Sequence, residues 1–274
     1  MMKAAVLGSP IKHSLSPLLH NYAYELLGIE GEYVAIEMVP ERLSEFLTSL
    51  DSNWRGLSLT MPLKESVLNL GIECDEKVIR THSANTILFG SHRELSATST
   101  DYTAFERLLE VNGDSNVAIL GAGGTARSAI GALNGLVPTI DLYLRDFAKG
   151  LAPKAAAPQS HVELHKLDTF SSEEFSRYDW IISTLPAGVS DGLAESLSSS
   201  SAKLSNLNFL EVLYHPWPTE LLLATKAHGA RTLDGADLLV EQALDQISLM
   251  TGESFDYPTM RKALLAKALE ALNS

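Results

Sequence analysis

The sequence contains very little cysteine, and this scarcity excludes two classes of protein. Cys74 is the only cysteine among 274 residues, so neither a disulfide framework nor a cysteine-rich zinc site can form. Long apolar runs are missing too. None reaches the about 18 residues that a membrane-spanning helix needs, and residues 4–7 are too short for the apolar part of a signal peptide. We therefore expect a cytoplasmic protein, whose thiol stays reduced.

Basic residues are also scarce relative to acidic ones. Lys and Arg total 21 against 34 Asp and Glu, which gives a formal net charge of −13. Nucleic acids and anionic membranes bind to basic surfaces, so neither is an expected partner. An anionic small molecule would need cations placed locally around it. Hydrophobic residues make up 45% of the chain, which is enough for a sizeable core, and the length corresponds to roughly two domains of ~150 residues.

Strand and helix signals alternate through the first hundred residues. Apolar runs predict strands at residues 3–7, 32–38 and 56–60. A helix is expected to begin with Ser16 as its N-cap and Pro17 at its first position, and to end at Gly28. A second helical stripe covers residues 43–50. This order predicts a mainly parallel sheet covered by helices.

The alternation restarts in the second half, after a division of the chain near residues 101–112. Strands are predicted at 117–120, 139–144, 178–185 and 208–213. Residues 151–161 indicate a loop or a weak helix, and residues 196–205 a serine-rich loop. Helices are expected from Gly235 onward and after Pro258.

A glycine-rich segment, Gly121-Ala122-Gly123-Gly124-Thr125-Ala126, lies between a predicted strand and a predicted helix. This context is typical of dinucleotide binding. The first glycine allows a tight turn, the second lets the backbone approach a pyrophosphate, and the alanine permits close contact between helix and sheet. The helix N-terminus then offers N–H groups to the phosphates. An ordinary glycine-rich turn is the alternative.

Three charged residues after the next predicted strand bear on the choice between NAD and NADP. A carboxylate at this place binds the ribose 2′-hydroxyl of NAD, whereas an arginine accommodates the 2′-phosphate of NADP. Arg145 and Lys149 favour NADP. Asp146 would repel the phosphate if its side chain pointed the same way, so NAD remains an alternative, as does a solvated loop without a ligand.

Polar residues also follow predicted strands in the first half. The loop at residues 8–17 offers hydroxyls that could bind a small hydroxylated acid, although an N-cap role alone would explain Ser16. Lys64 lies at the carboxyl end of a strand, where open α/β sheets bind ligands, although most single lysines are solvated surface charges. Asn85-Thr86 and Thr100-Asp101 are expected to follow short strands in the same half of the chain.

Together these motifs resemble the shikimate dehydrogenase family over almost the whole chain. In order, the matching segments are residues 8–21, 58–64, 85–86, 99–101, 121–126 and 214–219, with Gly235 and Gln242 after them. The resemblance implies reversible reduction of 3-dehydroshikimate to shikimate, a step of the chorismate and aromatic amino-acid pathway. The nicotinamide supplies the hydride in such a reaction, so no metal is expected. His161 and His165 are four residues apart, but no third metal ligand is evident.

The resemblance also implies a domain organisation and a set of site residues. Residues 1–101 and 235–274 would form an α/β substrate-binding domain with a mainly parallel sheet, to which the C-terminal helices return, and residues 102–234 a Rossmann-type NADP-binding domain. Lys64 and Asp101 would be the catalytic pair. The substrate would contact Ser14, Ser16, Thr60, Asn85, Tyr214 and Gln242. The cofactor would contact Gly121, Ala122, Gly123, Gly124, Thr125, Arg145, Lys149, Leu213 and Gly235.

Several residues depart from the family pattern. Ser58, Ser99 and Ser183 stand where many members have asparagine, and Leu144-Arg145-Asp146 replaces Asn-Arg-Thr. These departures leave alternatives open: a quinate/shikimate dehydrogenase that uses NAD, an enzyme of an amino analogue, or a non-catalytic member that binds dinucleotides. A folate-linked dehydrogenase is disfavoured by the serine and tyrosine motifs. The sequence allows a monomer or a homodimer.

Overall fold

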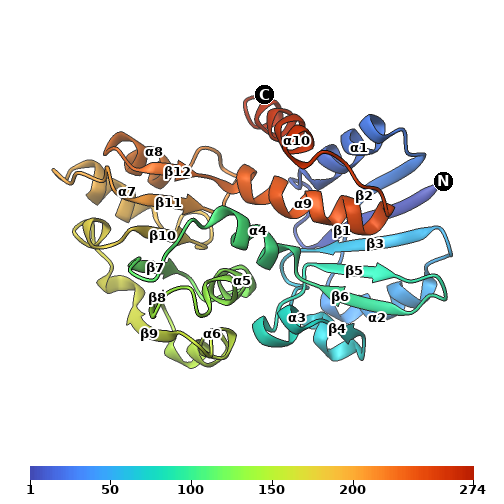
Figure 1. Ribbon diagram of the computed structural model, residues 1–274, viewed down its shortest axis with the longest axis horizontal. Coiled ribbons are helices and arrows are strands. Elements are labelled where there is room, and N and C mark those ends of the chain that lie inside the picture. The colour runs from blue at the N-terminus through green and yellow to red at the C-terminus, as the bar shows by residue number, and fades with distance from the viewer. The chain divides into compact units, whose positions relative to one another are not determined.

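The computed structural model describes residues 1–274, which form two compact units (Figure 1). The first unit consists of Met1–Ala104 and Leu239–Ser274, and the second of Phe105–Leu238. The boundaries predicted from the sequence were 101/102 and 234/235. That one unit binds substrate and the other the cofactor remains a prediction at this point.

The first unit is built on a six-stranded sheet with the order β2-β1-β3-β5-β6-β4. Its strands are β1 (Met2–Gly8), β2 (Gly31–Glu37), β3 (Trp54–Leu59), β4 (Glu73–Cys74), β5 (Thr86–Phe89) and β6 (Leu95–Thr98). The pairs β1/β2, β1/β3 and β4/β6 are parallel, whereas β5 is antiparallel to both of its neighbours. The prediction of a mainly parallel sheet is therefore confirmed, with one reversed strand inside it.

Helices cover this sheet because their apolar faces pack on alternate strand residues. Ala5, Leu7, Leu57 and Leu59 belong to one buried cluster, together with Leu43 of α2. The helices of the unit are α1 (Ser16–Leu27), α2 (Pro40–Ser49), α3 (Glu76–Thr81) and α10 (Tyr257–Leu272), with the 3-10 turn η1 (Ser66–Leu70). Helices α4 (Thr100–Leu108) and α9 (Gly235–Thr251) each have residues in both units. The C-terminal helices thus return to the first unit, as predicted.

The start of α1 differs from the prediction. Leu15 occupies the N-cap position, Ser16 is already helical, and no side chain caps the helix. The hydroxyl of Ser14 instead accepts a hydrogen bond from the Ser16 N–H at 3.3 Å. The predicted N-cap role of Ser16 is therefore wrong by one position, whereas Gly28 ends the helix as predicted, at a φ of 68°.

The second unit has an entirely parallel sheet with the order β12-β11-β10-β7-β8-β9. Its strands are β7 (Val117–Leu120), β8 (Thr139–Leu144), β9 (His161–Lys166), β10 (Trp180–Ser183), β11 (Asn208–Glu211) and β12 (Arg231–Leu233). Counted along the chain, this is the strand order 3-2-1-4-5-6 of a Rossmann fold, so the predicted fold class is confirmed. Strands β9 and β12 were not predicted from the sequence.

Short helices connect the strands of the second unit. They are α5 (Gly124–Leu133), α6 (Leu151–Ala156), α7 (Asp191–Ser198) and α8 (Glu220–Ala227), with the 3-10 turns η2 (Phe147–Gly150), η3 (Leu167–Thr169) and η4 (Glu174–Arg177). Residues 151–156 are thus helical. Of the loop and the weak helix expected for residues 151–161, the helix is present in this part. The prediction of a serine-rich loop at residues 196–205 is wrong for residues 196–198, because these form the last residues of α7.

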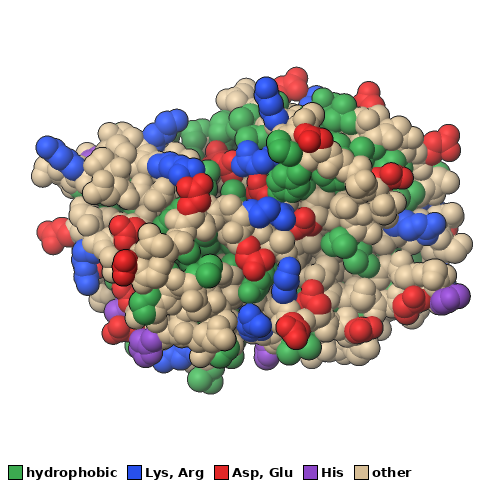
Figure 2. All heavy atoms as spheres, in the orientation of Figure 1, with side chains coloured by type: hydrophobic (Ala, Val, Ile, Leu, Met, Phe, Trp, Pro, Cys, Tyr) green, Lys and Arg blue, Asp and Glu red, His purple; other side chains and the backbone are tan.

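None of the helices combines the length and the apolar character needed to cross a bilayer. On the face shown in Figure 2, cationic and anionic side chains are interspersed rather than separated into one-sign areas.

Glu211 is a buried carboxyl group at the carboxyl end of β11. Its exposed fraction is 0%, and neither of its carboxylate oxygens has a close hydrogen-bond partner. Burial raises its pKa from 4.5 to about 7, because the charged form is poorly solvated. Between pH 4.5 and about 7, the Glu211 carboxyl group therefore stays mostly protonated in the native state, whereas it is mostly ionised in the unfolded chain.

The protonation of Glu211 should make stability pH-dependent. Between pH 4.5 and 7 the native state binds more protons than the unfolded state, so the free energy of unfolding falls as the pH rises, by up to about 3 kcal/mol. Urea unfolding at pH 5 and at pH 8 measures this fall. Between these two pH values, Glu211→Gln should lose less free energy of unfolding than wild type. Glu195→Gln, at an exposed position of α7, is the control. An unchanged loss in Glu211→Gln would contradict this assignment.

Candidate active site

The loops after β1 and β3 lie next to each other, because these two strands are parallel neighbours. The Ser9 N–H donates to the Met61 carbonyl at 3.0 Å, and the Thr60 N–H donates to the Leu7 carbonyl at 2.9 Å. A Cβ on Gly8 would lie 2.3 Å from Cγ2 of Thr60, so only glycine allows this approach. The polar loop that carries Ser14 and the segment that carries Lys64 therefore share one edge of the sheet.

The reversed strand β5 brings Asn85 to the same edge. Asn85 precedes β5, so the prediction that Asn85-Thr86 follow a strand is wrong. Because β5 is antiparallel to β3, its beginning lies beside the end of β3, with Thr86 opposite Ser58. The Ala84 N–H donates to the Lys64 carbonyl at 2.8 Å, which fixes the backbone of Lys64 to this segment.

Lys64 and Asp101 form a direct ion pair. The Lys64 Nζ lies 2.5 Å from Asp101 Oδ2, and the exposed fractions of the two side chains are 18% and 6%. Asp101 belongs to α4, which follows β6, and β6 ends opposite the start of β5. The structure thus brings the two residues of the predicted catalytic pair into contact from different elements.

Asn85 holds the other oxygen of this carboxylate. Its Nδ2 donates to Asp101 Oδ1 at 2.9 Å, and its Oδ1 accepts from the Thr100 N–H at 2.7 Å. The same Nδ2 lies 3.3 Å from Oε1 of Gln242 in α9. Both amide side chains are almost completely buried. Three predicted site residues, Asp101, Asn85 and Gln242, are therefore connected directly.

A further chain of hydrogen bonds connects Asn85 to Thr86, Gln246, Ser58 and Tyr33. Gln246 Nε2 donates to Thr86 Oγ1 at 2.9 Å, and this hydroxyl donates to Asn85 Oδ1 at 3.1 Å. Gln246 Oε1 accepts from Ser58 Oγ at 2.7 Å, and Ser58 Oγ accepts from the Tyr33 hydroxyl at 2.5 Å. Gln246 was not predicted from the sequence, because its only signal is its position one helical turn after Gln242. The hydroxyl of Ser58, one of the departures from the family pattern, is engaged inside the protein.

Removal of the Ser58 hydroxyl should destabilise the first unit. Ser58→Ala leaves the buried Tyr33 hydroxyl and the Gln246 carbonyl oxygen each without this partner, and we expect a loss of about 1–3 kcal/mol in the free energy of unfolding. Urea unfolding measures it, with the exposed Ser52→Ala as control. Tyr33→Phe combined with Ser58→Ala should lose less than the sum of the single variants, and additive losses would contradict the hydrogen bond between them.

The glycine-rich turn of the second unit has the backbone geometry for a pyrophosphate. Gly121 has a φ of 105°, and a Cβ there would lie 2.4 Å from Oγ1 of Thr184. Gly123 occupies the N-cap position of α5, and a Cβ on it would meet nothing within 4 Å. Ala126 is completely buried. The N–H groups of the first turn of α5 are therefore open to an anionic ligand, and these residues fit a dinucleotide.

The three charged residues after β8 have different surroundings. Asp146 Oδ1 accepts a hydrogen bond from the Ala148 N–H at 3.0 Å and caps η2, so its carboxylate is engaged locally. Arg145 and Lys149 are both exposed, but only Arg145 lines a cavity of about 730 Å³. The two predicted cations thus do not have equivalent positions.

The remaining predicted cofactor residues lie near the end of β11. A Cβ on Gly235 would lie 2.5 Å from the carbonyl carbon and oxygen of Leu213, so glycine is required where these two backbones meet. Tyr214 belongs to the same unit, and its contact with a substrate remains a prediction.

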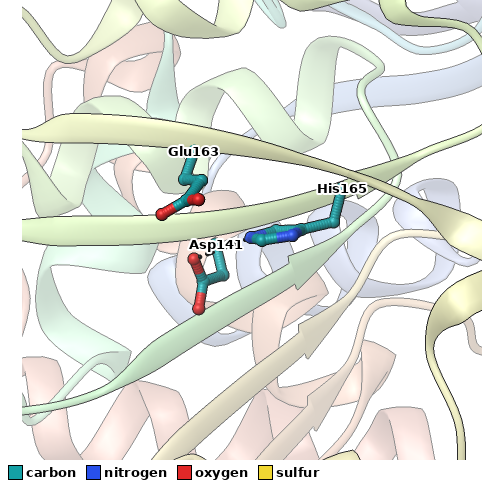
Figure 3. Close-up of side chains that lie close together, drawn as sticks. All are labelled: Asp141, Glu163 and His165. Carbon is teal, nitrogen blue, oxygen red and sulfur yellow. Dashed lines mark hydrogen bonds and ion pairs between the residues drawn. The ribbon is translucent and has the colours of Figure 1, made fainter.

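One cluster of potential metal ligands lies on β8 and β9 (Figure 3). Asp141 is the register partner of Glu163, and His165 Nε2 lies 3.0 Å from Asp141 Oδ1. The Tyr178 hydroxyl donates to Asp141 Oδ2 at 2.8 Å. His165 thus meets two carboxylates that the sequence analysis did not identify, and His161 is not a member of the cluster. Since Asp141 is already paired on both oxygens, we assign no metal here.

Comparisons with known proteins agree with these observations. The model of the shikimate dehydrogenase substrate binding domain matches residues 6–87. The chain is 31% identical to shikimate dehydrogenase (NADP(+)) of Ignicoccus hospitalis, over 97% of this chain and 99% of that protein. The crystal structure of Mycobacterium tuberculosis shikimate dehydrogenase is 30% identical, covers 97% of this chain and 100% of its own, and has a TM-score of 0.85.

A second solved structure carries a ligand. Shikimate 5-dehydrogenase of Thermus thermophilus in complex with shikimate is 26% identical over 100% of both chains, with a TM-score of 0.79.

Proposed function

Since the chain belongs to the shikimate dehydrogenase family, we propose that it catalyses the reversible NADP-dependent reduction of 3-dehydroshikimate to shikimate. The enzyme class is that of oxidoreductases acting on a CH–OH group. The observation that carries the proposal is the ion pair between Lys64 and Asp101 at a sheet edge rich in hydroxyl and amide groups. Curated relatives over nearly the full length bear the name shikimate dehydrogenase (NADP(+)).

Lys64 has the chemistry that a ketone reduction requires. NADPH, when bound, supplies a hydride to the carbonyl carbon, and negative charge then develops on the carbonyl oxygen. The ammonium at Lys64 Nζ stabilises this charge and delivers a proton, and in the opposite direction the amine takes the proton from the hydroxyl. The Lys64 side chain is 18% exposed, so its ammonium is partly shielded from solvent.

Asp101 orients the lysine. Its Oδ2 accepts from Lys64 Nζ, and its Oδ1 is held by Asn85, so the carboxylate has little freedom to rotate. We propose that this arrangement fixes Nζ toward the substrate and that Asp101 also binds a substrate hydroxyl.

The other site residues are assigned from the family pattern. Ser14, Ser16, Thr60, Asn85, Tyr214 and Gln242 would bind the carboxylate and hydroxyls of the substrate. Gly121 to Thr125, Arg145, Leu213 and Gly235 would bind the cofactor, with Lys149 as a further cation.

The protein would act on these small molecules in the cytoplasm, as a monomer or a homodimer and without nucleic acid or membrane partners. The single cysteine and the net charge of −13 support this part of the proposal.

Substitution of Lys64 tests the chemistry directly. Lys64→Met should lower kcat about 10²–10⁴-fold, because the developing oxyanion loses its proton donor, and should change KM much less. Steady-state absorbance of reduced nicotinamide measures both constants. Lys3→Met, at the opposite end of β1, is the control, and thermal unfolding verifies that both variants are folded. An unchanged kcat would remove Lys64 from the reaction.

Substrate and cofactor choice can be tested in the same assay. We expect the highest kcat/KM with shikimate and NADP, since curated relatives over nearly the full length bear the name shikimate dehydrogenase (NADP(+)). A higher value with quinate and NAD would favour the quinate/shikimate alternative. No turnover with any pair would favour a non-catalytic dinucleotide-binding protein.

A further inference from the structure

Lys166 occupies a position in the second unit that the cofactor assignment does not use. It is the last residue of β9 and the register partner of Leu144, the last residue of β8. Arg145 follows directly. The carboxyl ends of two parallel neighbouring strands therefore place Lys166 and Arg145 side by side at the edge of the sheet where Rossmann folds bind nucleotides.

Two contacts hold the Lys166 ammonium near Arg145. Its Nζ donates to the Arg145 carbonyl oxygen at 3.3 Å and lies 4.7 Å from the centroid of the Phe147 ring. Neither contact neutralises the charge. Lys166 and Arg145 have no carboxylate partner within ion-pair distance, so both cations are available to an anion.

Both cations line the same cavity. Its volume of about 730 Å³ lies in the range of cofactor sites, and apolar side chains, including Phe170, Leu185 and Leu193, contribute to its wall. Such a wall suits an adenine ring. Lys149 does not line this cavity.

Acidic side chains near the cavity do not cancel the two cations. Asp168 also lines the cavity and is exposed to solvent. Asp146 does not line the cavity, and its Oδ1 accepts a hydrogen bond from the Ala148 N–H. Two positive charges thus stand against one carboxylate in the lining.

We propose that Lys166 is a specificity-determining residue that binds the 2′-phosphate of NADP together with Arg145, in the place of the second cation that the family pattern assigns to Lys149. This inference rests on the proposed use of NADP. A 2′-phosphate carries close to two negative charges and is bound best by more than one cation. NAD has no 2′-phosphate and leaves both cations unpaired, so Lys166 increases the preference for NADP.

Direct binding of cofactor fragments separates this role from catalysis. Calorimetry with adenosine 2′,5′-bisphosphate and with 5′-AMP reports the contribution of the 2′-phosphate alone. Lys166→Met should raise the Kd of the bisphosphate about tenfold or more, as the loss of a charged hydrogen bond does, and leave the Kd of 5′-AMP unchanged. Lys166→Arg should retain most of the affinity. Lys154→Met, at an exposed position of α6 that does not line the cavity, is the matched control and should bind the bisphosphate within about twofold of wild type. Lys149→Met tests the alternative cation and should weaken binding of the bisphosphate less than Lys166→Met does.

The outcomes separate this inference from the proposed function. If wild type prefers the bisphosphate and Lys166→Met keeps that preference, or if Lys149→Met removes it instead, Lys166 is not the second cation, and NADP use stands. Equal weakening of both fragments by Lys166→Met would show a merely structural role and also overturn the inference. If wild type binds the bisphosphate no more tightly than 5′-AMP, the proposed NADP use fails and the role of Lys166 fails with it.

Discussion

The ion pair between Lys64 and Asp101 is the interaction around which the candidate active site is organised. Asp101 is almost completely buried, and a buried carboxylate needs both a cation and hydrogen-bond donors. Lys64 supplies the first, and Asn85 supplies the second. Asn85 is in turn fixed by the Thr100 N–H and by the hydroxyl of Thr86. The charge of the Asp101 carboxylate thus explains why so many polar groups are buried at this edge of the sheet.

The parts of the structure that the sequence predicted are those with strong local signals. The turn at Gly121 needs a positive φ, and Ala126 is completely buried against its surroundings, so these residues themselves indicate the dinucleotide fold. The capping glycine at Gly28 is a signal of the same kind. Lys64 and Asp101 came together only through the family resemblance, because 37 residues separate them and nothing local to either one indicates the other.

The misses have physical reasons as well. Strand β9 contains only two apolar residues, Val162 and Leu164, and β12 has only three residues, so neither forms an apolar run of the kind that predicted the other strands. The missed β9 also concealed Lys166, whose significance depends on the end of that strand lying beside Arg145. Asn85 was expected to follow a strand, but the short apolar run at residues 87–89 lies after it, and that run belongs to β5. Gln246 lies among apolar residues of α9, and only its buried partners distinguish it.

The reversal of β5 determines how the site is assembled from the chain. In a wholly parallel sheet, all strands begin at one edge and end at the opposite edge, so the residue before one strand lies far from the residue after its neighbour. Here β5 and β6 form an antiparallel pair in which Thr86 faces Thr98, so one hairpin carries the amide of Asn85 and, just beyond its second strand, the carboxylate of Asp101. The carboxylate of Asp101 and the amide of Asn85 are therefore brought together by one hairpin, whose short loop has a low entropic cost of closure. Only the lysine and the glutamines of α9 must be recruited from distant parts of the chain.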